Sequence, residues 1–383
     1  MKKIVLLVLA LALGMAPVSL AVEDTWTTKT GMPTAMFGLS SCVVDRKIYA
    51  IGGGSTGGII TGVEEYDPAT DTWMRKADMP TRRAFFSASV VNGKIYAIGG
   101  LAAPGGAGLR TVEEYDPATD TWTRKADMPT PRLHFSTSAV DGRIYAIGGM
   151  RTDYAPGLTT LEEYDPATDT WTRKSDMPTT RLAFSTCVVN GKMYAIGGAT
   201  SPGGTILSTV TEYDPATDTW TAKANMPTAR LWLSTTSLNG RIFAIGGCTG
   251  PYSATFSTVE EYDPVMNTWT TKAEMSTARK SLSTSTVNGK IYAIGGTSVA
   301  GWSAPLSTVE EYNLIPPSPD FNGDGKVDTD DLLILIANWG INEPLCDIGP
   351  TPFGDGLVDI KDLEVFMSYW EKENIPEIPE EEI

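Results

Sequence analysis

One pattern recurs six times along this 383-residue chain and limits the folds open to it. Single tryptophans return every 47 to 49 residues, at Trp26, Trp73, Trp122, Trp171, Trp220 and Trp269. Paired glycines keep the same spacing and begin at Gly52, Gly99, Gly148, Gly197, Gly246 and Gly295. A fixed period of this length is typical of repeat architectures, in which one unit cannot bury its apolar faces without neighbours.

Each unit is predicted to form four antiparallel strands. In the second unit these are residues 84–91, 94–98, 112–115 and 121–125. An Asn-Gly pair, a strong hairpin signal, joins the first two strands, and Asp-Pro-Ala-Thr-Asp joins the last two. A lone four-stranded sheet with two apolar faces leaves one exposed, whereas six sheets arranged radially bury every face. The sequence therefore predicts an all-β, six-bladed propeller.

The order of markers within the unit is similar to that of the kelch repeat. Gly-Gly comes first, then Glu-Glu-Tyr-Asp-Pro, then Trp, then Met-Pro, and the resemblance covers residues 24–313 without a gap. The tryptophan-aspartate propeller repeat has another order of markers, and its Gly-His signature is absent. The kelch propeller is assigned to residues 22–315.

The two ends of the repeat region predict how the ring closes. The sixth unit runs through Tyr312 but has no tryptophan after it, so its fourth strand is missing. The N-terminal Asp24-Thr25-Trp26 repeats Asp71-Thr72-Trp73 without preceding strands of its own. An N-terminal strand is therefore expected to complete the last blade and to remove an exposed sheet edge.

One face of the propeller is predicted to bind a ligand. The hairpins on one face repeat with little change, with Asn-Gly or Asp-Gly in five units, whereas the loops between second and third strands vary and carry residues such as Tyr252. Variable loops on a rigid scaffold are where binding usually resides. Beside them, five arginines precede the first strands: Arg83, Arg132, Arg181, Arg230 and Arg279. Two residues further on come Phe85, His134, Ala183, Trp232 and Ser281.

Two interpretations of the arginines are open. The kelch resemblance implies that arginines at this position rim a ligand pocket, together with Phe85, His134, Trp232 and Tyr252. Alternatively, they are structural residues that bind loop carbonyls at each blade junction.

Enzyme chemistry has little support in the sequence. The chain has a single histidine, which excludes sites that need two imidazoles, including those of copper-radical oxidases built on a related propeller. No nucleophile elbow, phosphate loop or zinc-type cluster is present. The recurring Glu pairs are interpreted as scaffold. Cys42 and Cys187 replace Ser or Thr of other repeats and are expected to be small buried residues.

The C-terminal region has a different character. After the Pro-rich linker 316–319, residues 320–331 place Asp or Asn at positions 1, 3, 5, 9 and 12 and Gly at 6, the arrangement of an EF-hand calcium loop. A helix is expected over 332–339. A weaker second copy, with a helix that reaches Trp370, has four extra residues between Asp347 and Asp355. Two loop-helix units resemble a dockerin, so residues 320–373 are assigned to a small, α-helical, dockerin-like module, followed by a disordered acidic tail at 374–383.

Each predicted Ca²⁺ ligand offers an oxygen atom at one of these loop positions. In the first loop they are Asp320, Asn322, Asp324, Lys326 through its carbonyl, Asp328 and Asp331, and in the second Asp355, Asp359 and Asp362. The region 316–383 holds 17 acidic and 3 basic side chains of a chain whose net charge is −16. Such a region attracts cations, and neither it nor the nearly balanced propeller suits nucleic acid.

The N-terminus predicts export. Residues 1–21 combine two lysines, a short apolar run and small residues before a cleavage point, which is the pattern of a signal peptide, and no membrane span is expected. The leading hypothesis is a secreted protein, outside the cell, in the periplasm or at the cell surface, that binds a glycan or protein ligand without catalysis. The dockerin resemblance implies docking to a cohesin-type scaffold in polysaccharide degradation. The alternatives are a kelch-type sugar enzyme, such as a sialic acid epimerase or glycosidase, and a surface structural protein.

Overall fold

The computed structural model describes residues 24–298, 304–314, 321, 327–340, 346, 348 and 358–373. The predicted signal peptide, the linker and the acidic tail lie outside the described residues. Two compact units form, one from Thr25–Asn313 and one that contains the described C-terminal helices. Among the described residues, no helix has the length and apolar character that a membrane crossing requires.

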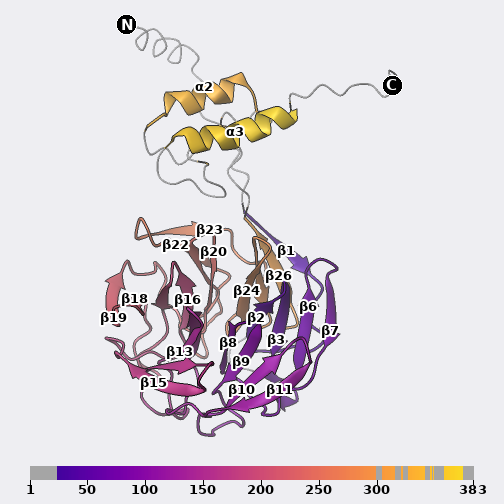
Figure 1. Cartoon of the computed structure of the whole chain (residues 1–383), viewed down its shortest axis with the longest axis vertical. Coiled ribbons are helices and arrows are strands. Elements are labelled where there is room, and N and C mark those ends of the chain that lie inside the picture. The colour runs from indigo at the N-terminus through magenta and orange to yellow at the C-terminus, as the bar shows by residue number, and fades with distance from the viewer. Residues whose placement is uncertain are drawn as a thin grey trace. The chain divides into compact units, whose positions relative to one another are not determined.

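Six four-stranded antiparallel sheets make up the first unit and lie around a common centre (Figure 1). Blade 1 contains β2 (Ser40–Val44), β3 (Lys47–Ile51), β6 (Val63–Asp67) and β7 (Thr72–Arg75). Blade 2 contains β8 (Ser87–Val91), β9 (Lys94–Ile98), β10 (Val112–Asp116) and β11 (Thr121–Lys125). Blade 3 contains β12 (Ser136–Val140), β13 (Arg143–Ile147), β14 (Leu161–Asp165) and β15 (Thr170–Lys174).

The remaining blades repeat this plan. Blade 4 contains β16 (Ser185–Val189), β17 (Lys192–Ile196), β18 (Val210–Asp214) and β19 (Thr219–Lys223). Blade 5 contains β20 (Ser234–Leu238), β21 (Arg241–Ile245), β22 (Val259–Asp263) and β23 (Thr268–Lys272). Blade 6 contains β24 (Ser283–Val287), β25 (Lys290–Ile294), β26 (Val309–Asn313) and β1 (Thr25–Lys29), and a small hairpin of β4 (Gly54–Ser55) and β5 (Gly58–Ile59) decorates blade 1. The six-bladed, all-β propeller is confirmed.

The core of the propeller lies between blades, because each sheet is apolar on both faces. Between blades 2 and 3, for example, Ile98 and Val112 of one sheet pack with Ile144 and Tyr164 of the next, and all four are fully buried. The first strands of neighbouring blades contact one another around the centre. Burial at these junctions is the main source of stability, at roughly 25 cal/mol per Å² of apolar surface.

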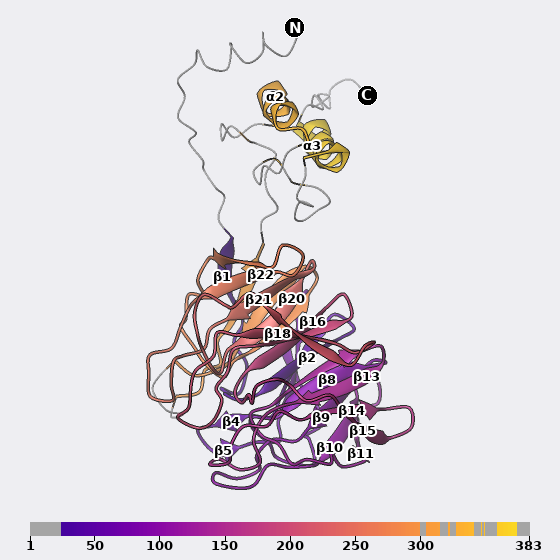
Figure 2. The same ribbon diagram turned by 90° about the vertical axis from the view of Figure 1, so that its left-hand side faces the viewer.

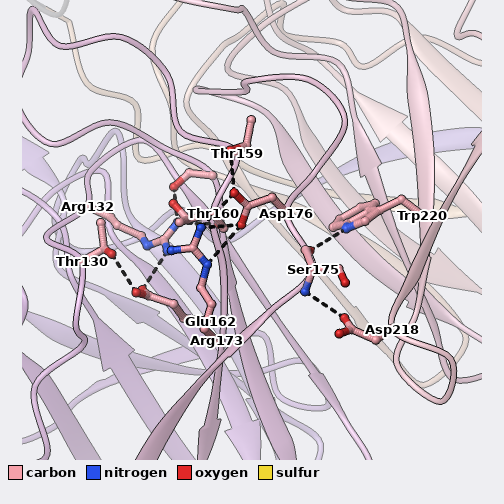
Figure 3. A network of polar contacts seen from close by, with 11 residues as sticks. Thr130, Arg132, Thr159, Thr160, Glu162, Arg173, Ser175, Asp176, Asp218 and Trp220 are labelled. Carbon is pink, nitrogen blue, oxygen red and sulfur yellow. Dashed lines mark hydrogen bonds and ion pairs between the residues drawn. The ribbon is translucent and has the colours of Figure 1, made fainter.

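Each tryptophan joins its blade to the preceding one. The indole N–H of Trp220 donates to the carbonyl of Ser175 at 2.9 Å, and the Ser175 N–H donates to Asp218 at 2.9 Å (Figure 3). The same ring packs against Tyr213 of its own blade in a tilted arrangement, with ring centroids 4.9 Å apart. The backbone of one residue, Ser175, is thus held through both its N–H and its C=O.

The N-terminal strand closes the ring as expected. Strand β1 pairs with β26 in antiparallel register, with Trp26 opposite Tyr312. The Trp26 indole donates to the carbonyl of Ala273, at the end of blade 5, at 2.9 Å. Sequence-distant ends therefore form the same contacts that join consecutive blades elsewhere.

The second unit contains α2 (Thr329–Ala337) and α3 (Ile360–Glu373), which lie side by side in both views (Figure 1, Figure 2). Helix α2 begins three residues before the expected start because Asp328 and Asp331 form a capping box around its first turn. Helix α3 continues three residues beyond Trp370. Leu335 and Phe366 are fully buried in the small core that the two helices share.

We predict that the ring depends on β1. Replacing the half-buried Trp26 with Ala removes an aromatic stack and an interblade hydrogen bond, and should lower the free energy of unfolding by about 2 to 3 kcal/mol in urea titrations. Thr27→Ala, on an exposed position of the same strand, is the control and should change it by less than about 0.5 kcal/mol. A chain that starts at Phe37 and unfolds with undiminished stability would contradict this account of closure.

Candidate functional site

A closed ring of backbone hydrogen bonds lies where the six first strands begin. Each residue donates its N–H to the carbonyl of its equivalent in the preceding blade, over 2.7 to 3.0 Å. The members are Gly38, Phe85, His134, Ala183, Trp232 and Ser281, and all have φ between 52° and 58°. A residue in this left-handed conformation cannot continue a regular strand, so each first strand starts after it. Strand β8 therefore begins at Ser87, whereas the sequence predicted a start at residue 84.

Three of these residues direct aromatic rings toward one another. The rings of Phe85 and His134 are 4.1 Å apart between centroids, and those of His134 and Trp232 are 6.0 Å apart. The Trp232 indole N–H donates to Nδ1 of His134 at 3.2 Å. Gly38 leaves room for this arrangement, since a Cβ there would lie 2.8 Å from the Phe85 ring.

A cavity of about 640 Å³ opens above this aromatic cluster. It is lined by loops between second and third strands and by the residues just before the first strands. Phe85, His134, Trp232 and Tyr252, which the sequence assigned to a ligand-binding face, all contribute to it. Aliphatic side chains make much of the remaining wall, among them Leu101, Leu182, Ile206 and Leu231. A concave, mostly apolar surface with a few polar groups is typical of a ligand site.

The single histidine is held neutral in this cavity. Burial lowers the pKa of His134 to about 3, and its Nδ1 already accepts a hydrogen bond from Trp232. The ring proton of the neutral imidazole therefore resides on Nε2, which is a donor and not a base. His134 is therefore suited to donate a hydrogen bond to an acceptor atom of a ligand, and less suited to acid–base catalysis near neutral pH.

A buried lysine behind the cavity wall was missed by sequence reasoning. Lys280 follows the repeat arginine, where the other units have Phe37, Ala84, Leu133, Leu182 and Leu231. Its Nζ donates to the carbonyl of Pro251 at 2.6 Å and lies 5.5 Å from the centre of the Trp232 ring. Burial lowers the pKa of Lys280. Lys280 thus links Trp232 to the loop that carries Tyr252.

The arginines do not rim the cavity, and that expectation from the kelch resemblance was wrong. Arg83, Arg132, Arg181, Arg230 and Arg279 are at most 1% exposed. Arg132 donates to the carbonyls of Gly148 and Thr160 at 2.7 and 2.9 Å. It also donates to Glu162 at 2.7 Å (Figure 3). Each guanidinium satisfies carbonyls at the end of its own blade, as the structural interpretation proposed.

Blade 4 departs from this scheme. Thr211 stands where Glu113, Glu162 and Glu260 pair with the arginines of blades 2, 3 and 5. Arg181 instead donates to Thr209 Oγ1 at 2.8 Å, and burial lowers the pKa of Arg181 to about 10. The repeat arginine therefore remains fully buried even without a facing carboxylate.

A second hollow, of about 480 Å³, lies beside blade 1 and includes Arg75 and Arg82. It is a weaker candidate because Arg75 already forms ion pairs with Asp78 and Glu64.

The C-terminal unit contains two matching buried carboxylates. Asp331, with no exposed surface, accepts from the backbone N–H of Phe321 at 2.7 Å and of Asp328 at 3.0 Å. Asp362, equally buried, accepts from Ile348 and Asp359, both at 2.6 Å. The two helices thus hold equivalent carboxylates through the same pattern of backbone hydrogen bonds.

The other predicted calcium ligands fall into two groups. Asp328 and Asp359 cap the helices, and each accepts a backbone N–H of the first helical turn. Asp320, Asn322, Asp324, Lys326 and Asp355 lie outside the described residues. Among the residues that the structure does describe, no group of three or more His, Cys, Asp or Glu side chains converges.

Comparison with known proteins decides the family. The KLHDC2/KLHL20/DRC7 Kelch-repeats domain matches residues 18–149 and 124–247, and the Kelch motif matches 233–276 and 278–315. The chain belongs to the kelch-repeat family. Among solved structures, one titled "Structure of YjhT" aligns with a TM-score of 0.63 and 17% identity over 73% of this chain and 96% of that chain. At this identity the likeness shows the kelch fold alone, and no curated protein matches the chain.

We predict that His134 does not titrate near neutral pH. It is the chain's one histidine, so its NMR signals are unambiguous, and they should not shift between pH 8 and 5. Because the folded pKa is about 3 and the unfolded one about 6.5, the unfolded state binds the proton first as pH falls, and folding stability is lost from pH 6.5 downward. His134→Phe should abolish about 3 kcal/mol of this loss by pH 4.5. A resonance midpoint above pH 5.5 would contradict the assignment.

Proposed function

We propose that this kelch protein is a secreted, non-enzymatic binding protein whose propeller holds a carbohydrate in the aromatic cavity. One observation carries the proposal: Phe85, His134, Trp232 and Tyr252 come from three different blades and line one cavity of about 640 Å³. Aromatic rings present flat apolar faces on which sugar rings stack, and their polar tips and the His134 Nε2–H provide hydrogen bonds to hydroxyls.

Binding is favoured over sugar conversion by the state of the polar groups. His134 is neutral and already bonded to Trp232, and Asp153 at the cavity edge accepts from the N–H of Gly105 at 3.1 Å. A sialic acid epimerase or glycosidase needs an acid and a base placed near the sugar. The repeat arginines, which would have matched an acidic sugar, are engaged within the blades.

The C-terminal unit is proposed to bind Ca²⁺ and to dock the propeller onto a cohesin-type scaffold during extracellular polysaccharide degradation. The buried carboxylates of Asp331 and Asp362 suit a hard cation, because a buried charge requires compensation beyond hydrogen bonds. Asp320, Asn322, Asp324, the Lys326 carbonyl and Asp328 would complete the first site with Asp331. The backbone N–H of Ile348 donates to Asp362 just as that of Phe321 donates to Asp331. This equivalence aligns residue 347 with Asp320, and Asp355 and Asp359 would be further ligands of the second site.

Substitution of Trp232 tests the carbohydrate proposal. In the full chain, Trp232→Ala should weaken binding of the saccharide that a glycan array identifies by at least tenfold in calorimetry, because the stacking face is lost. The free energy of unfolding should fall by no more than about 2 kcal/mol, since the side chain is half-buried. Val265→Ala, at an 83% exposed position outside the cavity, is the control. Unchanged saccharide affinity in Trp232→Ala, or sugar turnover by the wild type, would overturn the proposal.

Calcium binding is tested by titrating the chelator-treated full chain. Calorimetry should detect uptake of at least one Ca²⁺, with a rise in helical circular dichroism as the loops order around the ion. Asp331→Asn should abolish the first site. Asp330→Asn removes the same charge from the exposed neighbour and should leave uptake intact. Equal uptake by both variants would refute the assignment.

A further inference from the structure

The cavity is closed at its inner end. Phe85, His134 and Trp232 line both the 640 Å³ cavity and a separate space of about 90 Å³ in the channel beneath it. These three rings therefore stand between the two spaces, at the level of the hydrogen-bonded backbone ring. A ligand that enters from the loop face meets this aromatic floor and does not continue down the channel.

The outer end of the cavity has two protruding aromatic side chains. Tyr154, in the blade 3 loop, is 89% exposed, and Tyr252, in the blade 5 loop, is 83% exposed, yet both contribute to the lining. Their rings extend the aromatic surface beyond the cavity. The part of a long ligand that extends beyond the cavity can therefore stack on these two rings.

The charges of the cavity lining distinguish between peptides, nucleic acids and saccharides as ligands. Among the lining residues that the structure describes, Asp153 is the one acidic side chain, no Lys or Arg contributes, and His134 is neutral. A peptide carries a charge at each free terminus and a nucleic acid carries phosphates, whereas the end of a neutral saccharide chain carries hydroxyls. Placing an unmatched charge on an apolar floor is costly.

We propose that the cavity takes the uncharged end of a saccharide chain. The terminal sugar lies on the floor of Phe85, His134 and Trp232, and the following sugars leave past Tyr154 or Tyr252. This inference rests on the proposed carbohydrate function and adds that the protein recognises chain ends and not chain interiors, since a closed cavity admits a chain only by its end.

Titration with chains of increasing length tests the inference. The probes are cello-, xylo- and manno-oligosaccharides of two to six sugars and the corresponding polysaccharides, with the full chain. In the series that binds, molar affinity should rise until the chain reaches the rim and then remain constant. One protein should bind per polysaccharide chain at every length. A number of bound proteins that grows with chain length would overturn end recognition while leaving the carbohydrate function intact.

Two rim variants supply the matched comparison. Tyr154→Ala and Tyr252→Ala, both at exposed positions, should together weaken hexasaccharide binding at least fivefold and weaken disaccharide binding by a clearly smaller factor. Trp232→Ala should weaken both. Undiminished affinity of the double rim variant for the hexasaccharide would show that no sugar continues past the rim and would overturn this part of the inference. Failure of every saccharide to bind, or capture of peptides with free termini instead, would overturn the carbohydrate function and this inference with it.

Discussion

Burial of two apolar faces on every sheet is the constraint from which the rest of this propeller follows. A blade such as β8–β11 has Val91 and Ile98 facing one neighbour and Ile95 and Ala97 facing the other, all of them buried. The sheets can satisfy this requirement only as a closed ring, because an open array leaves its end faces in water. Closure then brings six equivalent backbone segments to the centre, where each N–H meets the carbonyl of its neighbour.

The same closure explains the buried arginines. In blade 3, Arg132 donates to the Gly148 carbonyl and adds a second donor to the Thr160 carbonyl, which already accepts the Gly148 N–H; a buried carbonyl without a donor is costly. One guanidinium provides several donors in a fixed plane and so satisfies these carbonyls from one position. In most blades a glutamate such as Glu162 compensates the charge. Blade 4 lacks it, which indicates that the carbonyl contacts, and not the ion pair, fix the place of the arginine.

The fold was more predictable from the sequence than the site. Regular spacing of Trp26 and its equivalents sufficed for six blades and for the closing strand, because these residues make the same interblade bonds at every junction. The start of the first strands was misplaced, since no sequence signal marks Phe85 or Trp232 as left-handed. The arginines were misassigned because regular recurrence describes scaffold and binding residues alike. The glutamate two residues before the tyrosine recurs with the same period as the arginine. This matching period could have indicated that the two residues pair within the scaffold.

Comparison among the six copies also separates what the scaffold requires from what the cavity adds. The central ring needs only a left-handed backbone, and Gly38, Ala183 and Ser281 provide it with little or no side chain. A non-glycine residue pays roughly 1 kcal/mol or more for that conformation. Phe85, His134 and Trp232 adopt it with large rings that the ring of hydrogen bonds does not use, and Lys280 is buried beside one of them where other units have an apolar residue. Phe85, His134 and Trp232 line the cavity and Lys280 lies behind its wall, so the strain and the buried charge are costs that the proposed ligand site explains and the fold does not require.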